Sequence, residues 1–287
     1  MKKLFKRVYS AVPFKHFVFK QLRKLRLSEK VYKHLHFTAP IRIKYKKADF
    51  VMFHYGYRVE NDLFWAGYGN SWEGNSLKIW YKLVNMHHKV ADIGANTGVY
   101  ALTAASSNSA AQVAAFEPVD RVCGRLESNV KLNNYQIKTH NLALSNYKGT
   151  AEIFTEGQDH VYSVTVNKDI SNTSSPKTRE EIRVDRLDNV FDAESFPDLI
   201  KIDVETHEAE VIEGMGSLLD TMPTMLVEVL NDQVAESIEG LLSHLDYQVY
   251  DVPDKSEIRK LSRVQKAKDF NLLFCTEEVA KQLGIND

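Results

Sequence analysis

A turn with two glycines stands between a predicted strand and a predicted helix, and it offers the clearest chemistry in the sequence. The turn runs Asp92-Ile93-Gly94-Ala95-Asn96-Thr97-Gly98 and follows the apolar run 89–93. Gly94 would allow close approach of the backbone, and Gly98 would allow close packing of the helix on the sheet. The start of the helix offers free N–H groups and a partial positive charge to an anion. A pyrophosphate suits the GxGxxG spacing of nicotinamide enzymes, but these glycines stand four residues apart. A carboxylate with an ammonium beside it fits better, and the methionine end of S-adenosylmethionine carries both groups.

An acid at the end of the next predicted strand adds a second contact for such a ligand. Glu117 lies in the motif Phe116-Glu117-Pro118, 19 residues after Gly98. An acid in this place can accept hydrogen bonds from both hydroxyls of an adenosine ribose. Alone, Glu117 could equally be a solvated acid, but with the glycine turn it predicts an adenosine site. Ala143, in the run 141–144, is a candidate for the adenine wall, with plain strand packing as the alternative. The predicted cofactor-binding residues are Asp92, Gly94, Ala95, Asn96, Gly98, Glu117, Pro118 and Ala143.

Alternating apolar runs and helical patterns predict the elements that position these residues. Strands are expected at 89–93, 112–117, 139–144, 198–203 and 224–229, with helices at 97–106, 120–133, 206–219 and 232–245. Such alternation indicates βαβ units and a parallel sheet, and ligands bind at the carboxyl edge of such a sheet. Two further strands at 248–252 and 270–275 would complete a seven-stranded sheet with its last two strands antiparallel.

Two segments depart from this alternation. Residues 50–86 are rich in aromatic side chains, and we expect them to form a cap over the carboxyl edge of the sheet. Trp72-Glu73 could reach a ligand from this cap, although ordinary packing explains the pair equally well. Residues 155–179 are polar, and a loop of this length is usually functional or disordered. The expected organisation is a basic arm (1–48), an aromatic cap (49–86) and a Rossmann-like domain (87–287).

Further motifs follow in order along the second half of the chain. They are Lys201-Ile202-Asp203-Val204-Glu205-Thr206-His207-Glu208, Pro223 with Leu226-Val227-Glu228-Val229, and Asn271-Leu272-Leu273-Phe274. With the glycine turn and the Phe116-Glu117-Pro118 motif, they resemble the FkbM-type methyltransferase family over roughly residues 75–275. Thr206 departs from the family, which usually has glycine at this place, and this puts the local backbone conformation in question. The resemblance implies an α/β, Rossmann-like class I methyltransferase fold with a seven-stranded, mostly parallel sheet, here with a basic helical arm and an aromatic cap.

The resemblance also implies methyl transfer from S-adenosylmethionine, usually to a hydroxyl oxygen of a sugar or natural product. A hydroxyl oxygen is a poor nucleophile until its proton is removed, and His207 is the best-placed general base in the sequence. Asp203 and Glu228 end neighbouring predicted strands, so they could orient the acceptor, orient His207 or share a divalent ion. The predicted catalytic residues are His207, Asp203 and Glu228. No fixed metal motif is present, so a divalent metal stays open and no metal ligand is predicted. The alternatives are a solvated histidine and a structural salt bridge for Glu228.

The charge of the chain is distributed unevenly. Residues 1–48 hold 15 Lys and Arg and one acid, Glu29, although the formal net charge of the chain is −1. Apolar residues at helical spacings, such as Leu4 and Val8, are interspersed among these charges. They predict a basic amphipathic helix that contacts an anionic membrane peripherally. The alternative is an arm that packs on the acidic body or on a second copy of the chain. No stretch approaches the ~20 apolar residues of a membrane span. Two cysteines, Cys123 and Cys275, favour a reduced, cytoplasmic protein.

Other functions fit the sequence less well. An N-methyltransferase acting on a small molecule is the alternative within the same chemistry, whereas the sequence lacks the Asn-Pro-Pro-Tyr type of tetrad of nucleic-acid amino methylation. A non-catalytic nucleic-acid-binding module would use the basic arm, where aromatic and basic residues interleave at 15–20. No known nucleic-acid motif accompanies them, so we expect no nucleic-acid partner. The glycine spacing disfavours a nicotinamide-dependent oxidoreductase. The expected partner is a small-molecule or glycan acceptor, and neither its identity nor the oligomeric state is predicted.

Overall fold

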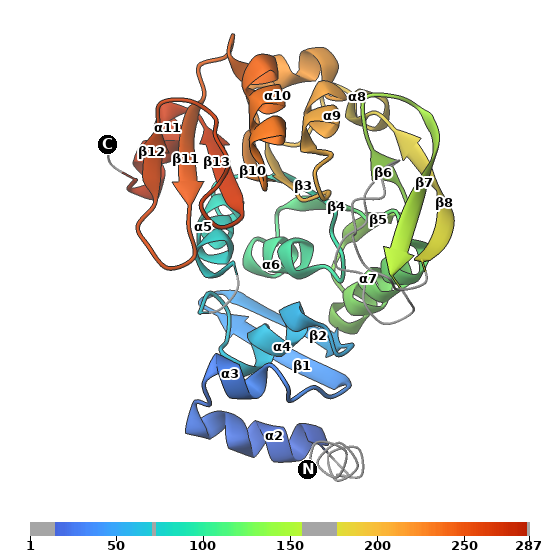
Figure 1. Cartoon of the computed structure of the whole chain (residues 1–287), viewed down its shortest axis with the longest axis vertical. Coiled ribbons are helices and arrows are strands. Elements are labelled where there is room, and N and C mark those ends of the chain that lie inside the picture. The colour runs from blue at the N-terminus through green and yellow to red at the C-terminus, as the bar shows by residue number, and fades with distance from the viewer. Residues whose placement is uncertain (1–14, 71–72, 157–176, 286–287) are drawn as a thin grey trace.

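One large sheet carries the residues of interest. The computed structural model describes residues 15–70, 73–156 and 177–285 (Figure 1). The central strands are mostly apolar and are buried along their whole length, as expected for a sheet covered on both faces. The sheet has eight strands in the order β12 (Arg259–Leu261), β11 (Gln248–Val252), β13 (Asn271–Cys275), β10 (Thr224–Glu228), β9 (Leu199–Ile202), β3 (Lys89–Ile93), β4 (Gln112–Phe116) and β5 (Ile137–His140).

The directions of the strands confirm a mostly parallel sheet and correct one detail. Strands β5, β4, β3, β9 and β10 are parallel neighbours. Strand β13 is antiparallel to both β10 and β11, so β11 runs in the same direction as β10. The prediction that Gln248–Val252 would be antiparallel is therefore wrong. A helix lies between β10 and β11 in the chain, and such a crossover delivers a parallel strand. The short β12, which the sequence did not predict, is antiparallel to β11 at the edge.

Helices cover both faces of the sheet and form two separate apolar cores. In Figure 1, α5 (Gly74–Val84), α6 (Val99–Ser107) and α7 (Asp120–Asn133) lie on the side of the N-terminal elements. On the other side lie α8 (Leu187–Val190), α9 (Glu208–Glu213) and α10 (Asp232–Leu242), whereas α11 (Glu277–Leu283) packs with α5. The predicted helix 206–219 is interrupted: α9 ends before Gly214, and a 3₁₀-helix, η2 (Gly216–Thr221), follows. Gly216 has φ +55°, a left-handed conformation that cannot continue an α-helix.

A second, three-stranded sheet replaces part of the predicted polar loop. It consists of β6 (Ala143–Leu144), β8 (Lys177–Asp185) and β7 (Gly149–Glu156), in this order. The loop predicted at 155–179 thus overlaps the ends of β7 and β8, and its residues 157–176 lie outside the described residues. The predicted strand 139–144 is divided between the two sheets, because β5 ends at His140 and β6 pairs with β8. Ala151, Ile153, Ile182 and Val184 form the buried face of the small sheet.

The N-terminal elements pack on the body of the molecule. They are α2 (Lys15–Leu22), η1 (Arg23–Leu25), α3 (Glu29–Tyr32), β1 (Ala39–Tyr45), β2 (Ala48–His54) and α4 (Arg58–Trp65). Phe19 of α2 is buried against Phe37 and Trp65, and Tyr32 of α3 stacks on Trp65. From residue 15 onward one face of the arm packs on the body of the molecule, whereas the predicted Leu4–Val8 helical face lies outside the described residues. Among the described residues, no helix is long and apolar enough to cross a membrane.

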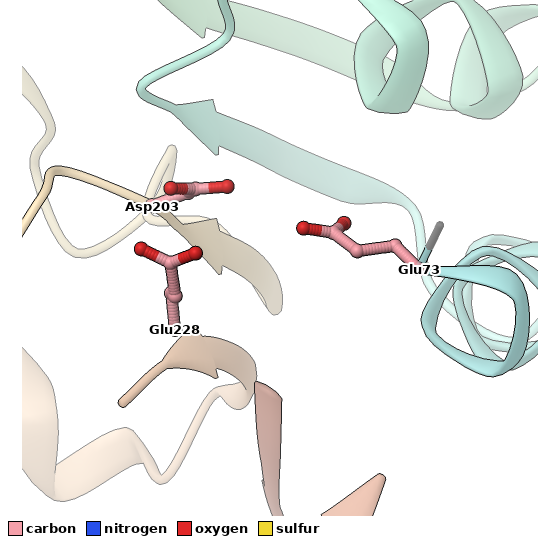
Figure 2. Close-up of side chains that lie close together, drawn as sticks. All are labelled: Glu73, Asp203 and Glu228. Carbon is pink, nitrogen blue, oxygen red and sulfur yellow. The ribbon is translucent and has the colours of Figure 1, made fainter. Parts of the chain in front are cut away.

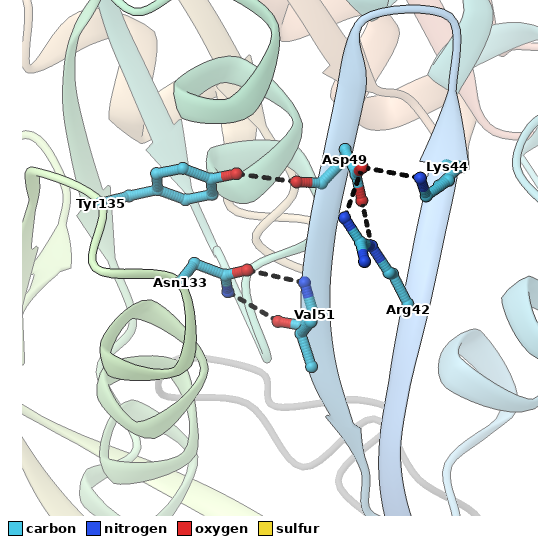
Figure 3. A network of polar contacts seen from close by, with 6 residues as sticks. All are labelled: Arg42, Lys44, Asp49, Val51, Asn133 and Tyr135. Atoms are coloured by element: carbon cyan, nitrogen blue, oxygen red, sulfur yellow. Dashed lines mark hydrogen bonds and ion pairs between the residues drawn. The ribbon is translucent and has the colours of Figure 1, made fainter.

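The β1–β2 hairpin joins the segments predicted as arm and cap. Its strands pair in antiparallel register from Ala39 with His54 to Tyr45 with Ala48. The side-chain amide of Asn133 in α7 accepts from the N–H of Val51 and donates to its carbonyl, both at 2.6 Å (Figure 3). The Tyr135 hydroxyl donates to the carbonyl of Asp49. The hairpin thus docks against α6 and α7 instead of covering the carboxyl edge of the sheet, and that position is taken by α4 and the start of α5.

Candidate functional site

A cavity of about 840 Å³ lies at the carboxyl ends of β3, β4, β9 and β10. This volume is within the range of roughly 300–1,000 Å³ that is typical of small-molecule sites. Parallel strands end at the same edge of a sheet, and for this reason the residues that follow them converge here. Nine of the eleven predicted site residues line the cavity: Gly94, Ala95, Asn96, Glu117, Pro118, Ala143, Asp203, His207 and Glu228.

The glycine turn is shaped by its neighbouring strand. Gly94 has φ +79°, and a Cβ atom there would lie 1.8 Å from the carbonyl oxygen of Asp203. Glycine is therefore needed so that the backbone after β9 can approach, which the sequence did not reveal. The N–H groups of Gly94 and Ala95 donate to the carbonyl of Phe116, and the N–H of Asn96 donates to Glu117. These three amides are engaged within the protein, so an anion must use groups further along the turn.

Two predicted residues lie behind the cavity wall and support the turn. Asp92 is 1% exposed and accepts a 2.9 Å hydrogen bond from the N–H of Ala101 in α6. Burial raises the pKa of Asp92 to about 7. Gly98 has φ +97°, and a Cβ there would lie 2.6 Å from Leu126 of α7. Gly98 therefore permits close packing of α6 on α7, not of the helix on the sheet as we expected.

Glu117 presents a fixed carboxylate to the cavity. Its Oε2 accepts from the N–H of Asn96 and its Oε1 from the N–H of Val119, both at 3.0 Å. Burial raises the pKa of Glu117 to about 7, although the two amide donors lower it. Each oxygen can accept more than one hydrogen bond, so the carboxylate can still receive a ligand hydroxyl.

An acidic cluster occupies another part of the site. It consists of Glu73, Asp203 and Glu228, which offer one oxygen each within 4.8 Å of one another. Figure 2 shows the three carboxylates pointing toward each other from the start of α5, from the residue after β9 and from the end of β10. Burial raises the pKa of Glu228 far above its ordinary value, and the charge of Asp203 adds to the shift. The sequence analysis correctly predicted that Asp203 and Glu228 lie in one site, but it did not include Glu73 among the site residues.

Lys201 is a second residue that the sequence analysis missed. Its side chain is fully buried, with Nζ 3.3 Å from Oδ2 of Asp203 and 5.2 Å from the centre of the Tyr100 ring. Burial lowers the pKa of Lys201, but the charges of Asp203, Glu73 and Glu228 outweigh this effect and raise it. A lysine within the apolar run Leu199–Ile202 was the available signal, because buried ammonium groups require anionic partners.

His207 lines the cavity at the start of α9, with 14% of its side chain exposed. Its Nε2 lies 2.9 Å from the hydroxyl of Ser145, and its Nδ1 lies 3.6 Å from a carboxylate oxygen of Glu210. An acceptor hydroxyl would therefore have to compete with Ser145 for Nε2. The preceding turn is held by Glu208, whose Oε1 accepts from the N–H groups of Val204 and Thr206.

Comparison with known protein families matches residues 92–252, more than half of the chain, to the methyltransferase FkbM domain. This chain belongs to the FkbM methyltransferase family. It is an S-adenosylmethionine-dependent methyltransferase, and its sheet has the strand arrangement of class I enzymes of this kind. The family resemblance and the fold class predicted from the sequence are both confirmed.

Three of the solved structures that are similar to this chain are as follows. Methyltransferase FkbM from Methylobacillus flagellatus KT is 16% identical with a TM-score of 0.41, and the match covers 66% of this chain and 43% of that chain. Precorrin-6y C5,15-methyltransferase from Geobacter metallireducens GS-15 is 11% identical with a TM-score of 0.40, over 71% and 88%. Fibrillarin from Aeropyrum pernix, with natively bound S-adenosyl-L-methionine, is 12% identical with a TM-score of 0.39, over 66% of each chain. This chain thus spans less than half of the Methylobacillus protein. Comparison with curated proteins gave no match.

The cavity of this methyltransferase has the chemistry that S-adenosylmethionine requires. Apolar side chains beside Glu117, among them Val122, Leu142 and Leu144, offer a surface for an aromatic base. Glu60 of α4, which the sequence analysis missed, is fully buried and accepts a 3.0 Å hydrogen bond from the hydroxyl of Thr97. Its second oxygen, Oε2, has no partner among the described residues. An unpartnered buried carboxylate oxygen beside the glycine turn suits a cationic group such as an amino-acid ammonium.

Proposed function

We propose that this methyltransferase transfers the methyl group of S-adenosylmethionine to a hydroxyl oxygen of a glycan or another small hydroxylated acceptor. The observation that carries this proposal is the continuity of one cavity from Glu117 and the glycine turn to Asp203, His207 and Glu228. A cofactor and an acceptor can therefore be held in contact, and positioning two reactants is a large part of such catalysis.

The proposed cofactor contacts use both walls of the cavity. Glu117 accepts hydrogen bonds from the ribose hydroxyls, and Pro118 and Ala143 contact the adenosine. The turn at Gly94, Ala95 and Asn96 surrounds the methionine end, with Asp92 and Gly98 as its supports. Glu60 accepts the ammonium group, since its Oε2 has no partner among the described residues. When bound, this cofactor supplies an electrophilic methyl group on a sulfonium.

The proposed catalytic residues act on the acceptor. Asp203 and Glu228 accept hydrogen bonds from its hydroxyls and fix the reacting oxygen. His207 takes the proton, with Glu210 facing its other ring nitrogen at 3.6 Å. Oxygen is favoured over nitrogen as the methylated atom because a hydroxyl requires such a proton acceptor, and the cavity wall supplies carboxylates and an imidazole.

A methyl-transfer assay on a panel of acceptors tests this proposal. The panel contains nucleotide sugars, lipid-linked glycans, free saccharides and, as the opposing class, small primary amines. Labelled methyl groups should appear on sugar oxygens, which NMR of the product identifies. Methylation confined to amine nitrogen would contradict the proposal and support the alternative of an N-methyltransferase.

We further propose that the arm contacts an anionic membrane surface. Phe17 and Leu25 are 67% and 68% exposed, and Lys20 and Lys24 are exposed beside them. Each basic residue near an anionic bilayer contributes about 1 kcal/mol of binding, and exposed aromatic side chains enter the interface. Contact of this kind would bring the cavity to a lipid-linked acceptor.

Co-sedimentation with anionic vesicles tests this contact. The protein should pellet at low salt and much less at high salt, because salt screens exposed charges. The double variant Phe17→Ser/Leu25→Ser should remain in solution. Leu132→Ser is the matched control, because Leu132 is an exposed leucine of α7 outside the arm. Equal sedimentation of all three proteins would contradict the contact.

A further inference from the structure

The acidic cluster of Glu73, Asp203 and Glu228 contains carboxylate oxygens that the protein leaves without partners. Glu73 is fully buried and Glu228 is 6% exposed. Oε1 of Glu73 and Oε2 of Glu228 have no hydrogen-bond partner among the described residues. A buried carboxylate oxygen without a partner carries a large desolvation cost, so such atoms indicate a group that is bound in the working protein.

The charges of the cluster identify the kind of group. Three carboxylates lie within 4.8 Å of one another, and Lys201 is the cation that contacts them among the described residues. Its ammonium lies 3.3 Å from Oδ2 of Asp203 and compensates one of the three negative charges. The remaining charge of −2 requires either protons or one divalent cation. The convergence of oxygens from three separate elements favours the cation, because a proton does not need three ligands.

We propose that Glu73, Asp203 and Glu228 hold a divalent cation in this methyltransferase. Ligand sets made only of carboxylate oxygens are typical of Mg²⁺, Mn²⁺ and Ca²⁺. Oxygens on opposite sides of Ca²⁺ lie about 4.6–5.2 Å apart, and those on opposite sides of Mg²⁺ about 4.0–4.2 Å apart. Oxygen atoms that all lie within 4.8 Å of one another can bind either ion after small rotations of the side chains.

The backbone at Glu73 agrees with a binding role. Glu73 has φ +53°, a conformation that costs a side-chain-bearing residue free energy and tends to occur at functional sites. The carboxylate of Asp254 accepts from the N–H of Glu73 at 3.0 Å and fixes this conformation. The result directs the Glu73 carboxylate toward the ends of β9 and β10 (Figure 2). Glu73 therefore completes a site that the strand ends alone would leave with two ligands.

The catalytic role of the ion rests on the proposed function. The binding of the ion by the three carboxylates does not depend on that function. Asp203 and Glu228 line the cavity and Glu73 does not, so the ligands surround the ion from the inner side. The open side of the ion would then face an acceptor hydroxyl and lower its pKa. Proton removal from the hydroxyl would become easier for His207 or for water.

Metal titration of the cofactor-free protein tests the binding. Mn²⁺ is followed by electron paramagnetic resonance, and Mg²⁺ and Ca²⁺ by calorimetry. One site per chain is expected. Glu73→Gln, Asp203→Asn and Glu228→Gln keep the side-chain size, and each should weaken binding by more than about 10–100-fold, the loss that even outer-sphere partners cause. Glu60→Gln is the matched control, because Glu60 is another buried acid with an unpartnered oxygen, and its metal affinity should equal that of the parent.

The outcomes separate this proposal from the proposed function. S-adenosylmethionine binding, measured on the same proteins without metal, reports on the cofactor site. Intact cofactor binding without any saturable metal binding would overturn the cation site and leave the methyltransferase assignment untouched. Metal binding that survives in Glu73→Gln would also overturn it. If Glu73→Gln does not fold, Glu73→Asp replaces it, because the shorter side chain keeps the charge but withdraws the ligand atom.

Discussion

The two parts of the cavity hold their carboxylates in opposite ways. Beside the glycine turn, each oxygen of Glu117 accepts from a backbone N–H. In the acidic cluster, Glu73 and Glu228 each keep one buried oxygen without a partner among the described residues. At Glu117 the protein itself supplies a donor to both oxygens, whereas the acidic cluster, like Glu60 beside the turn, keeps a buried oxygen for a group from outside. A carboxylate that accepts hydrogen bonds from the backbone is held in a fixed orientation. A carboxylate oxygen without a partner remains available to bind an ion or a ligand group.

Because of this difference, substitutions in the two parts of the site should affect stability and activity differently. Substitution beside the turn removes partners of backbone amides, so affinity and folding should change together. Neutralising Glu73 or Glu228 relieves repulsion between like charges, so folding should be unaffected or improved while chemistry is lost. Asp203 also pairs with buried Lys201, so neutralising Asp203 should lower stability. Such a trade-off between stability and function is common at active sites.

The largest expected effect is on turnover. His207→Ala should lower kcat by about 10²–10⁴-fold, the usual contribution of a general base. Asp203→Asn should also lower kcat, because Asp203 fixes the reacting oxygen. The dissociation constant of S-adenosylmethionine should change little. Ser145→Ala is the control, because it removes the hydroxyl that lies 2.9 Å from Nε2 of His207 and leaves the imidazole in place. Turnover in Ser145→Ala should be preserved. Normal turnover in His207→Ala would return this residue to a structural role.

The next effect is on cofactor affinity. Glu117→Ala should weaken binding of S-adenosylmethionine by up to about 100-fold, because unpaired ribose hydroxyls cost about 1–3 kcal/mol. The melting temperature should fall as well, since the amides of Asn96 and Val119 lose their acceptor. Glu117→Gln keeps one acceptor oxygen, so its affinity for S-adenosylmethionine and its melting temperature should lie between those of the parent and of Glu117→Ala. Calorimetric titration measures the affinity, and an unchanged dissociation constant in Glu117→Ala would contradict the ribose contact.

Glu60 should show a dependence on pH. Burial raises its pKa from 4.5 in the unfolded chain to about 7 in the folded protein. Between these values the unfolded chain releases a proton that the folded protein keeps, so stability falls as the pH rises from about 4.5 to 7. Glu60→Gln removes this penalty, which is on the order of 1–3 kcal/mol above pH 7.

Two measurements check the prediction for Glu60. Cofactor-free Glu60→Gln and its parent should have equal stability near pH 4.5, and the variant should be more stable at pH 8. Its affinity for S-adenosylmethionine should nevertheless fall by about tenfold or more, because a charge-assisted hydrogen bond to the ammonium is lost. Parallel stability curves of the two proteins across this pH range would show that folding does not change the protonation of Glu60 and would contradict the prediction.

The residues at strand ends could be predicted because topology alone brings them together. Gly94, Glu117, Asp203 and Glu228 each end or follow a parallel strand, so their positions follow from the strand pattern. The exact contacts of these residues could not be predicted from the strand pattern. Gly94 makes room for the carbonyl of Asp203, which lies more than one hundred residues away in the chain. Local spacing identifies a glycine turn but not the distant backbone that requires it.

The contributions of the cap could not be predicted. Glu60 and Glu73 come from segments whose path over the sheet has no periodic pattern to reveal it. The small sheet was missed as well. Its alternating buried apolar and outward polar residues lie on either side of the predicted loop 155–179, in stretches for which the sequence analysis predicted no element. Lys201 lies within an apolar strand, and only the three-dimensional arrangement shows the acids that compensate its charge.

The smallest expected effect concerns the place where the sequence departs from its family. Thr206 has φ +76°, a conformation that is unusual for a β-branched residue and costs about 1–2 kcal/mol. Thr206→Gly removes this strain but increases the entropy of the unfolded chain, which costs roughly 0.5–1 kcal/mol. The free energy of unfolding should therefore rise by about 0.5–1 kcal/mol. The N–H of residue 206 still donates to Glu208, so the turn keeps its hydrogen bond.

Thr150→Gly is the matched control, because Thr150 is exposed in β7 without a positive φ, and this variant should be less stable than its parent. Urea unfolding of the three proteins measures the difference, and a loss of stability in Thr206→Gly would mean that the turn holds threonine without strain.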